Sequence, residues 1–96
     1  MKTFYVMKNF DKDTLKLITE NTHNHGLILM QDAVLLSIEM KNNTIVKTYG
    51  ANGNLYSLKP DALKRGITKK MVPGVQLIDH DELVDILFSG AKILNL

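Results

Sequence analysis

Two apolar segments that meet at a polar pair constrain this chain more than any other feature. Residues 27–30 are Leu-Ile-Leu-Met, and after Gln31 and Asp32 a second apolar segment begins at Ala33. Four consecutive apolar residues are typical of a strand buried on both faces, as in parallel sheets. Asp32 is suited to cap a following helix, because its carboxylate accepts hydrogen bonds from free backbone N–H groups. A strand that leads directly into a helix indicates an α/β fold.

The remaining sequence alternates strand-like and helix-like segments. We expect strands at residues 3–7, 27–30, 55–58, 75–78 and 91–96, and helices at residues 11–21, 32–41, 60–65 and 80–89. Asp79 and Glu82 have the spacing of a capping box for the last helix. Thr44–Tyr49 fits either a strand or a short helix that ends at Gly50. The order predicts a small three-layer sandwich, with helices on both faces of a mostly parallel sheet of four or five strands.

Composition narrows the chemistry that the chain can perform. There is no cysteine, which excludes disulfides, thiolate metal ligands, thiol nucleophiles and the carriage of a persulfide. With 96 residues, 45% hydrophobic and 23% charged, the sequence predicts one domain over residues 1–96. No segment has the pattern of a signal peptide or the length of a membrane span, so we expect a cytoplasmic protein.

Positive charge is concentrated in one part of the chain. Residues 41–70 contain seven Lys or Arg and a single acidic residue, Asp61, an excess of six positive charges. The candidate anion- or RNA-facing patch consists of Lys59, Lys64, Arg65, Lys69 and Lys70. Such a patch can attract phosphates or an acidic partner, although a cluster of this kind is more often only a solvated surface. Aromatic residues for base stacking are missing apart from Tyr56, and Arg65 could instead fix the short helix against a neighbouring loop.

The expected helix after Asp32 has two apolar stripes. At about 100° per residue, Val34, Leu35 and Ile38 form the first stripe, and the second consists of Ala33, Leu36 and Met40. One stripe is enough to pack a helix on a sheet. The second is covered either by loops of the same chain or by another subunit, because small proteins rarely leave an apolar patch in water. We therefore take Ala33, Leu36 and Met40 as a candidate partner interface.

Polar residues follow the expected strands at the carboxyl edge of the sheet, where ligands of open parallel sheets bind. This strand-end cluster consists of Gln31, Asp32, Asp79 and His80. A histidine with two carboxylates is capable of acid–base chemistry, but both aspartates are expected to cap helices and no nucleophile accompanies them. His23 and His25 lie in a polar turn without further ligands nearby in the sequence. We therefore predict no catalytic residue, no metal site and no cofactor.

Three segments resemble one family. Residues 55–68, Leu-Tyr-Ser-Leu-Lys-Pro-Asp-Ala-Leu-Lys-Arg-Gly-Ile-Thr, look like a segment of the sulfur-relay family that contains DsrH and TusB. Residues 75–84 and 29–34 continue the resemblance, which extends from residue 27 to residue 88 and is poor near 41–53. The chain departs from the family pattern at Ala33, where glycine is usual, at Pro60, where an acidic residue is usual, and at His80, where tyrosine is common. It also lacks the cysteine that some members carry in the first helical region.

The resemblance implies a cytoplasmic complex with DsrE/TusD-like and DsrF/TusC-like subunits. Such complexes transfer persulfide sulfur in one of two pathways. One is the 2-thiolation of the wobble uridine of certain tRNAs, and the other is dissimilatory sulfur oxidation. A cysteine-free member would be an accessory subunit, and the family resemblance favours a helix at Thr44–Tyr49. The alternative is a self-associating α/β protein without a role in sulfur transfer.

Overall fold

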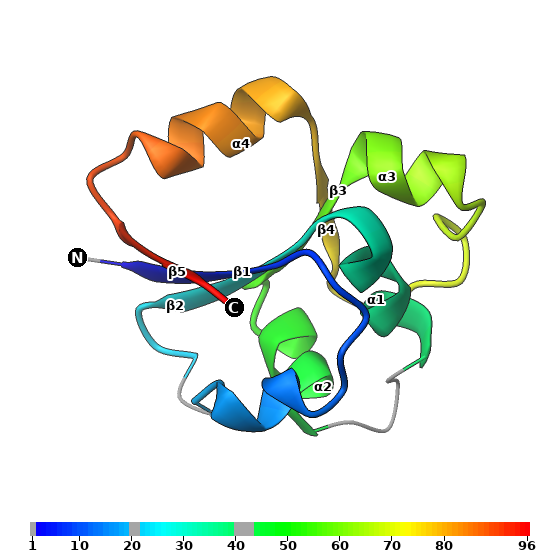
Figure 1. Ribbon diagram of the computed structural model, residues 1–96, viewed down its shortest axis with the longest axis horizontal. Coiled ribbons are helices and arrows are strands. Elements are labelled where there is room, and N and C mark those ends of the chain that lie inside the picture. Colours follow the sequence, from blue (N-terminus) through cyan, green and yellow to red (C-terminus); the bar gives the residue numbers. More distant parts are fainter. Residues whose placement is uncertain (1, 20–21, 40–43) are drawn as a thin grey trace.

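The computed structural model describes residues 2–19, 22–39 and 44–96 (Figure 1). The strands are β1 (Thr3–Met7), β2 (His25–Leu29), β3 (Leu55–Leu58), β4 (Gln76–Ile78) and β5 (Lys92–Asn95). The helices are α1 (Leu36–Glu39), α2 (Thr44–Ala51), α3 (Lys59–Lys64) and α4 (His80–Leu87), with two 3-10 helices, η1 (Thr14–Leu17) and η2 (Gln31–Leu35). None of the helices in these ranges is long and apolar enough to cross a membrane.

The five strands form one sheet in the order β4-β3-β2-β1-β5, and all four neighbouring pairs are parallel. The chain crosses the sheet in one direction from β1 to β4 and then returns past β1 to form β5. Because crossovers between parallel strands are right-handed, the returning connection must cover the opposite face. Figure 1 shows α4 on one side of the sheet and η1, α1 and α2 on the other. The predicted three-layer α/β sandwich is confirmed.

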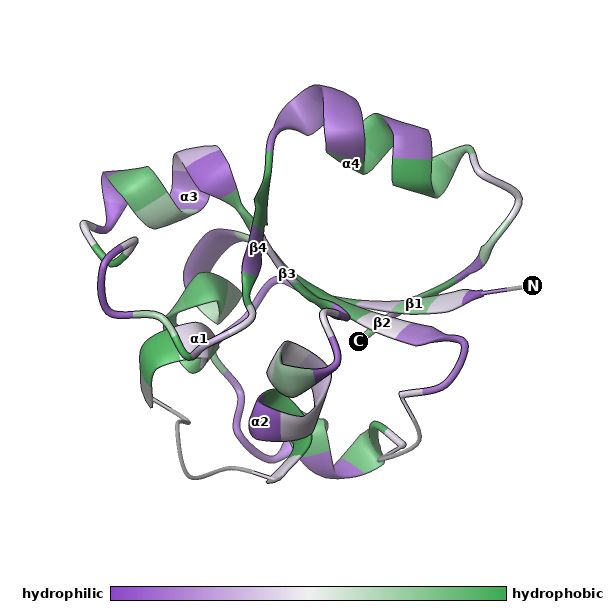
Figure 2. Cartoon of the chain, turned by 180° about the vertical axis from the view of Figure 1, so that it is seen from behind, coloured by the Kyte–Doolittle hydropathy of each residue, from purple (hydrophilic) through white to green (hydrophobic). Residues whose placement is uncertain are grey.

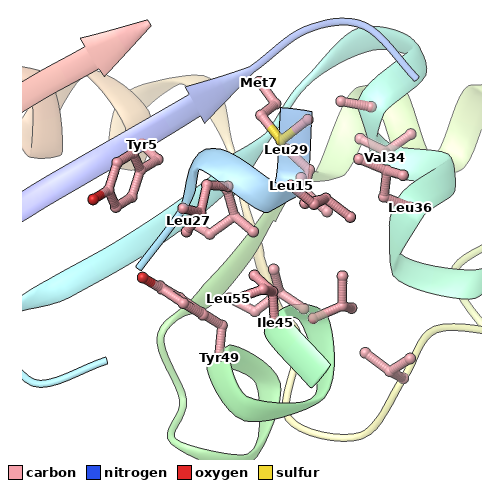
Figure 3. Packing of buried hydrophobic residues seen from close by; sticks show 14 of the residues in the cluster. Tyr5, Met7, Leu15, Leu27, Leu29, Val34, Leu36, Ile45, Tyr49 and Leu55 are labelled. Atoms are coloured by element: carbon pink, nitrogen blue, oxygen red, sulfur yellow. The ribbon is translucent and has the colours of Figure 1, made fainter. Parts of the chain in front are cut away.

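Two hydrophobic clusters hold the layers together. Successive residues of a strand point to opposite faces, so Tyr5 and Met7 belong to one cluster and Phe4 and Val6 to the other. The larger cluster lies between the sheet and η1, η2, α1 and α2, and its side chains are shown in Figure 3. The smaller cluster, under α4, consists of Phe4, Val6, Ile28, Leu58, Ile78 and Leu83. The central strand β2 is therefore buried on both faces, as its apolar run predicts.

The uncertain segment Thr44–Tyr49 is part of helix α2. Ile45, Val46 and Tyr49 are buried in the larger cluster, and their i, i+1, i+4 spacing places them on one side of a helix. The capping box of α4 is also present. The Asp79 carboxylate accepts a hydrogen bond from the Glu82 N–H at 2.8 Å, and the Asp79 N–H donates to the Glu82 carboxylate at 3.3 Å.

The helix expected over residues 11–21 is much shorter than predicted. Of the expected range, residues 11–19 are described, and within them only Thr14–Leu17 is helical, as the 3-10 helix η1. Asp11 accepts hydrogen bonds from the Asp13 N–H at 3.0 Å and from the Thr14 hydroxyl at 2.7 Å, which stabilises a turn before η1. Leu15 is buried, whereas Leu17 is 73% exposed. The predicted apolar stripe is too narrow to hold a longer helix on the sheet.

Tyr49 makes the stability of the fold decrease at alkaline pH. Its side chain is fully buried, and its hydroxyl donates a hydrogen bond to the Thr19 carbonyl oxygen at 2.8 Å. Burial, with a smaller contribution from Tyr5, raises the pKa of Tyr49 from 10.0 to about 12. The folded state therefore binds this proton more tightly than the unfolded state. The stabilisation is complete below about pH 10 and is lost as pH rises towards about 12.

We predict that Tyr49→Phe removes this part of the alkaline loss of stability. Between about pH 9 and about pH 12, the free energy of unfolding should fall less in the variant than in the parent, by on the order of 2–3 kcal/mol. At neutral pH the variant should be less stable by about 1 kcal/mol, because it lacks the hydrogen bond to Thr19. Urea unfolding at a series of pH values measures both quantities. Parallel curves for the two proteins would contradict the prediction.

Candidate functional site

At the carboxyl edge of the sheet, the end of β2 is held by α3. Gln31 is the first residue of η2 and has a left-handed backbone, with φ of 50°. Its N–H donates a hydrogen bond to the Asp61 carboxylate at 2.7 Å. A left-handed glutamine is strained, so this bond stabilises a backbone that the residue would not adopt alone. The step from β2 to the helix therefore depends on a contact with α3 and is not set by local residues alone.

Arg65 completes the link between α3 and η2. Its guanidinium donates to the Asp32 carboxylate at 2.8 Å and to the Asp61 carbonyl oxygen at 3.1 Å. The Arg65 and Asp61 side chains are each 23% exposed, whereas that of Asp32 is 69% exposed. Arg65 therefore fixes the short helix against the neighbouring turn, the structural alternative that its sequence position allows. The prediction that Asp32 caps a helix is wrong, because the helix begins after Met30 without a side-chain cap and Asp32 pairs with Arg65.

The predicted strand-end cluster is divided between two helices. Gln31 and Asp32 contact α3, whereas Asp79 is engaged in the capping box of α4 and His80 is exposed on the first turn of that helix. No hydrogen bond or ion pair between described residues joins the two pairs. Asp61 was not assigned to this edge from the sequence, yet it binds the Gln31 N–H through its carboxylate and Arg65 through its carbonyl oxygen. No local pattern in the sequence identifies a contact across 30 positions.

The predicted interface stripe faces the protein's own core. Ala33 and Leu36 are completely buried in the larger cluster, so they present no surface to another subunit. Met40 lies outside the described residues. The reason is that the chain itself covers both apolar stripes: Ala33, Val34 and Leu36 are buried in the larger cluster, and Leu35 and Ile38 pack against it. The interface prediction is therefore wrong for Ala33 and Leu36.

The exposed apolar surface lies on α4 instead. Val84, Leu87 and Phe88 have the i, i+3, i+4 spacing of a single stripe and are 47%, 40% and 84% exposed. We call these three residues the α4 outer face. Leu83 and Ile86 form the inner stripe that packs on the sheet. Figure 2 shows apolar and polar segments alternating along this helix, and its exposed acidic residues are Asp81, Glu82 and Asp85.

The apolar residues of this surface are visible in the sequence. Separating residues 83 and 86 from residues 84, 87 and 88 requires knowing how much of α4 touches the sheet.

Four of the five residues of the predicted basic patch remain available to a partner. Lys59, Lys64, Lys69 and Lys70 are exposed, whereas Arg65 is committed to Asp32 and Asp61. The four lysines come from α3 and the segment that follows it, and none forms an ion pair with another described residue. Their charges are therefore available to an anionic partner.

His25 is the first residue of β2, and the sheet places it beside β1. The His25 ring stacks on Tyr5 with 5.8 Å between the ring centroids. Within residues 2–19, 22–39 and 44–96, no three His, Cys, Asp or Glu side chains are grouped so that they could hold a metal ion.

Comparisons with known proteins identify both a family and a fold. The model of the family described as "DsrH like protein" matches residues 9–92. No curated protein matches the chain. The crystal structure of the ychN protein from E. coli is similar with a TM-score of 0.73 and 18% identity, covering 100% of each chain. A conserved protein of unknown function from Bacteroides thetaiotaomicron, BT1422, is similar with a TM-score of 0.68 and 19% identity, covering 99% of this chain and 95% of that one. At these identities the two structures establish the fold alone.

We predict that Asp61 of α3 and Asp32 of η2, which link these two elements, contribute unequally to the free energy of unfolding. Asp61→Ala removes the acceptor of the Gln31 N–H and should lower the free energy of unfolding by about 1–2 kcal/mol. Asp32→Ala removes an exposed ion pair and should cost less than about 1 kcal/mol. Urea unfolding of the two variants measures the difference. Equal losses would show that the hydrogen bond to Gln31 does not stabilise the turn.

Proposed function

The chain belongs to the DsrH-like family, and we propose from this membership that it is an accessory subunit of a sulfur-relay complex whose other subunits carry the persulfide. The observation that supports the accessory role is the absence of cysteine from the 96 residues. Sulfane sulfur is accepted and donated by a thiolate, and no other side chain can replace it in that exchange. The chain would therefore position a partner's thiol and not react itself.

The proposed partners are cytoplasmic DsrE/TusD-like and DsrF/TusC-like subunits, at least one of which carries the reactive cysteine. The α4 outer face is the surface best suited to dock such a subunit. Burying Phe88 in an interface stabilises a complex by about 1.5–3 kcal/mol, because its ring is almost entirely exposed in the isolated chain. Asp81, Glu82 and Asp85 lie on the same helix, so the matching surface of the partner should be apolar with a basic rim.

The sulfur would pass to the wobble uridine of tRNA, as 2-thiolation. Lys59, Lys64, Lys69 and Lys70 support this destination, since four exposed lysines without a described acidic partner favour contact with phosphates. The lysines belong to α3 and its following segment and not to α4, so a docked subunit and a tRNA could be bound together. Dissimilatory sulfur oxidation is the alternative destination, and it would need no RNA contact.

We predict that Val84→Lys/Phe88→Lys weakens the complex with the cysteine-bearing subunits at least tenfold. Lysine suits the C-terminal end of a helix, so α4 should stay folded, while its charge opposes the expected basic rim. The matched control is Leu17→Lys, which places the same charge at an exposed leucine of η1. Native mass spectrometry of reconstituted mixtures measures assembly, and circular dichroism checks folding.

Three outcomes would contradict this proposal. The double variant could assemble as well as the Leu17→Lys control, which would exclude the α4 outer face. Alternatively, the parent chain could recover only copies of itself from native extract, which would favour the self-associating protein. Labelled sulfane bound by the purified chain alone would refute the accessory role itself.

Deleting the gene should lower the 2-thiouridine content of tRNA in the source organism. Because the chain would position sulfur chemistry carried by others, a complementing copy with Val84→Lys/Phe88→Lys should fail to restore the modification and Leu17→Lys should restore it. Mass spectrometry of tRNA nucleosides provides the measurement. Unchanged thiolation combined with impaired oxidation of reduced sulfur would assign the chain to the dissimilatory pathway.

A further inference from the structure

A pocket of about 320 Å³ opens beside α2, on the face of the sheet opposite to α4. Ile38 of α1, Ala51 of α2 and the consecutive residues Met71, Val72 and Pro73 line it with apolar groups. Two charged side chains complete the lining, Lys47 from α2 and Lys70 from the segment before Met71. We call this cavity the α2 pocket. Its volume is near the lower end of the range for small-molecule sites, about 300–1,000 Å³.

Backbone contacts fix the walls of the α2 pocket. The Val72 N–H donates a hydrogen bond to the Ser37 carbonyl oxygen at 2.8 Å, which holds the wall segment on the α1 side. On the α2 side, Gly74 packs directly against the backbone of Gly50, and a Cβ at Gly74 would overlap the Gly50 carbonyl group. A Cβ at Gly50 would lie 2.8 Å from the Pro73 carbonyl oxygen. Two glycines therefore allow the segment to approach α2 closely, and this approach fixes one wall of the pocket.

The charges around the pocket have one sign. Lys47 and Lys70 are exposed, and neither forms an ion pair within the part of the chain that the structure describes. Among the described residues that line the pocket there is no carboxylate. An ammonium group binds a carboxylate through charge-assisted hydrogen bonds, which are stronger than neutral ones. An inorganic anion would leave the apolar walls unoccupied, whereas a hydrocarbon would leave the two cations without a partner.

We propose that the α2 pocket binds a small organic anion with an apolar body, of the class of medium-chain carboxylates. The alkyl chain lies against Ile38, Ala51 and Val72, and the carboxylate lies between Lys47 and Lys70. The proposal does not rest on the relay function, because the α4 outer face is on the other side of the sheet and the assay uses the isolated chain. Lys70 is the one residue that the pocket shares with the basic patch. Failure of either proposal leaves the other intact.

Titration of the ¹⁵N-labelled chain with octanoate, followed by NMR, tests the proposal. Chemical shift changes are expected at Ile38, Ala51 and Val72. Lys47→Gln/Lys70→Gln should weaken octanoate binding at least tenfold, whereas the control Lys59→Gln/Lys64→Gln, with the same charge loss outside the pocket, should change it less than twofold. Ala51→Phe places a ring in the pocket from an exposed position of α2 and should abolish the shifts while the spectrum stays that of a folded protein.

The neutral analogue 1-octanol separates the contribution of the charge. It should bind at least tenfold more weakly than octanoate. The proposal is overturned by shifts that lie outside the pocket, by octanol binding as tightly as octanoate, or by equal weakening in the two lysine pairs. Persistence of the shifts in Ala51→Phe would also overturn it.

Discussion

The architecture depends on the complete burial of β2. Leu27, Ile28 and Leu29 are fully inaccessible, and β2 pairs with β1 on one side and β3 on the other. A strand without any exposed face requires cover from both directions, so the chain needs helices above and below the sheet. Right-handed crossovers then decide which helix lies where. The returning connection supplies only α4 for the second face, and this eight-residue helix has its outer apolar stripe in solvent.

Elements that are specified by adjacent residues could be predicted from the sequence. The strand Thr3–Met7, the strand Leu55–Leu58 and the capping box of α4 all agree with the structure, because alternation, β-propensity and cap spacing act over a few residues. The turn after β2 could not be predicted. Asp32 and Gln31 find their partners in Arg65 and Asp61, at least 30 positions away, and these contacts replace the local helix cap.

The candidate surfaces were harder to predict than the fold, for a related reason. Periodicity identifies apolar stripes but not the width of the surface that each stripe covers. It therefore assigned Leu36 to an interface, although this residue is buried. The basic residues were found by composition alone, but only the structure removes Arg65 from that patch and assigns it to the edge of the sheet. The α2 pocket is lined by α1, α2 and residues 70–73. No single sequence motif contains all three segments, so none predicts the pocket.

The parallel pairing of β1 with β5 has a consequence for how the chain folds. Thr3 pairs with Lys92, so the two strands that meet there come from opposite ends of the described chain. Every other pairing also joins segments separated by a crossover, and no hairpin is available to start the sheet. Long loops must close before these contacts form, which slows folding. During synthesis, β1 must wait for its second neighbour until residues 92–95 have left the ribosome, and until then one side of that strand is open to pairing with another nascent chain.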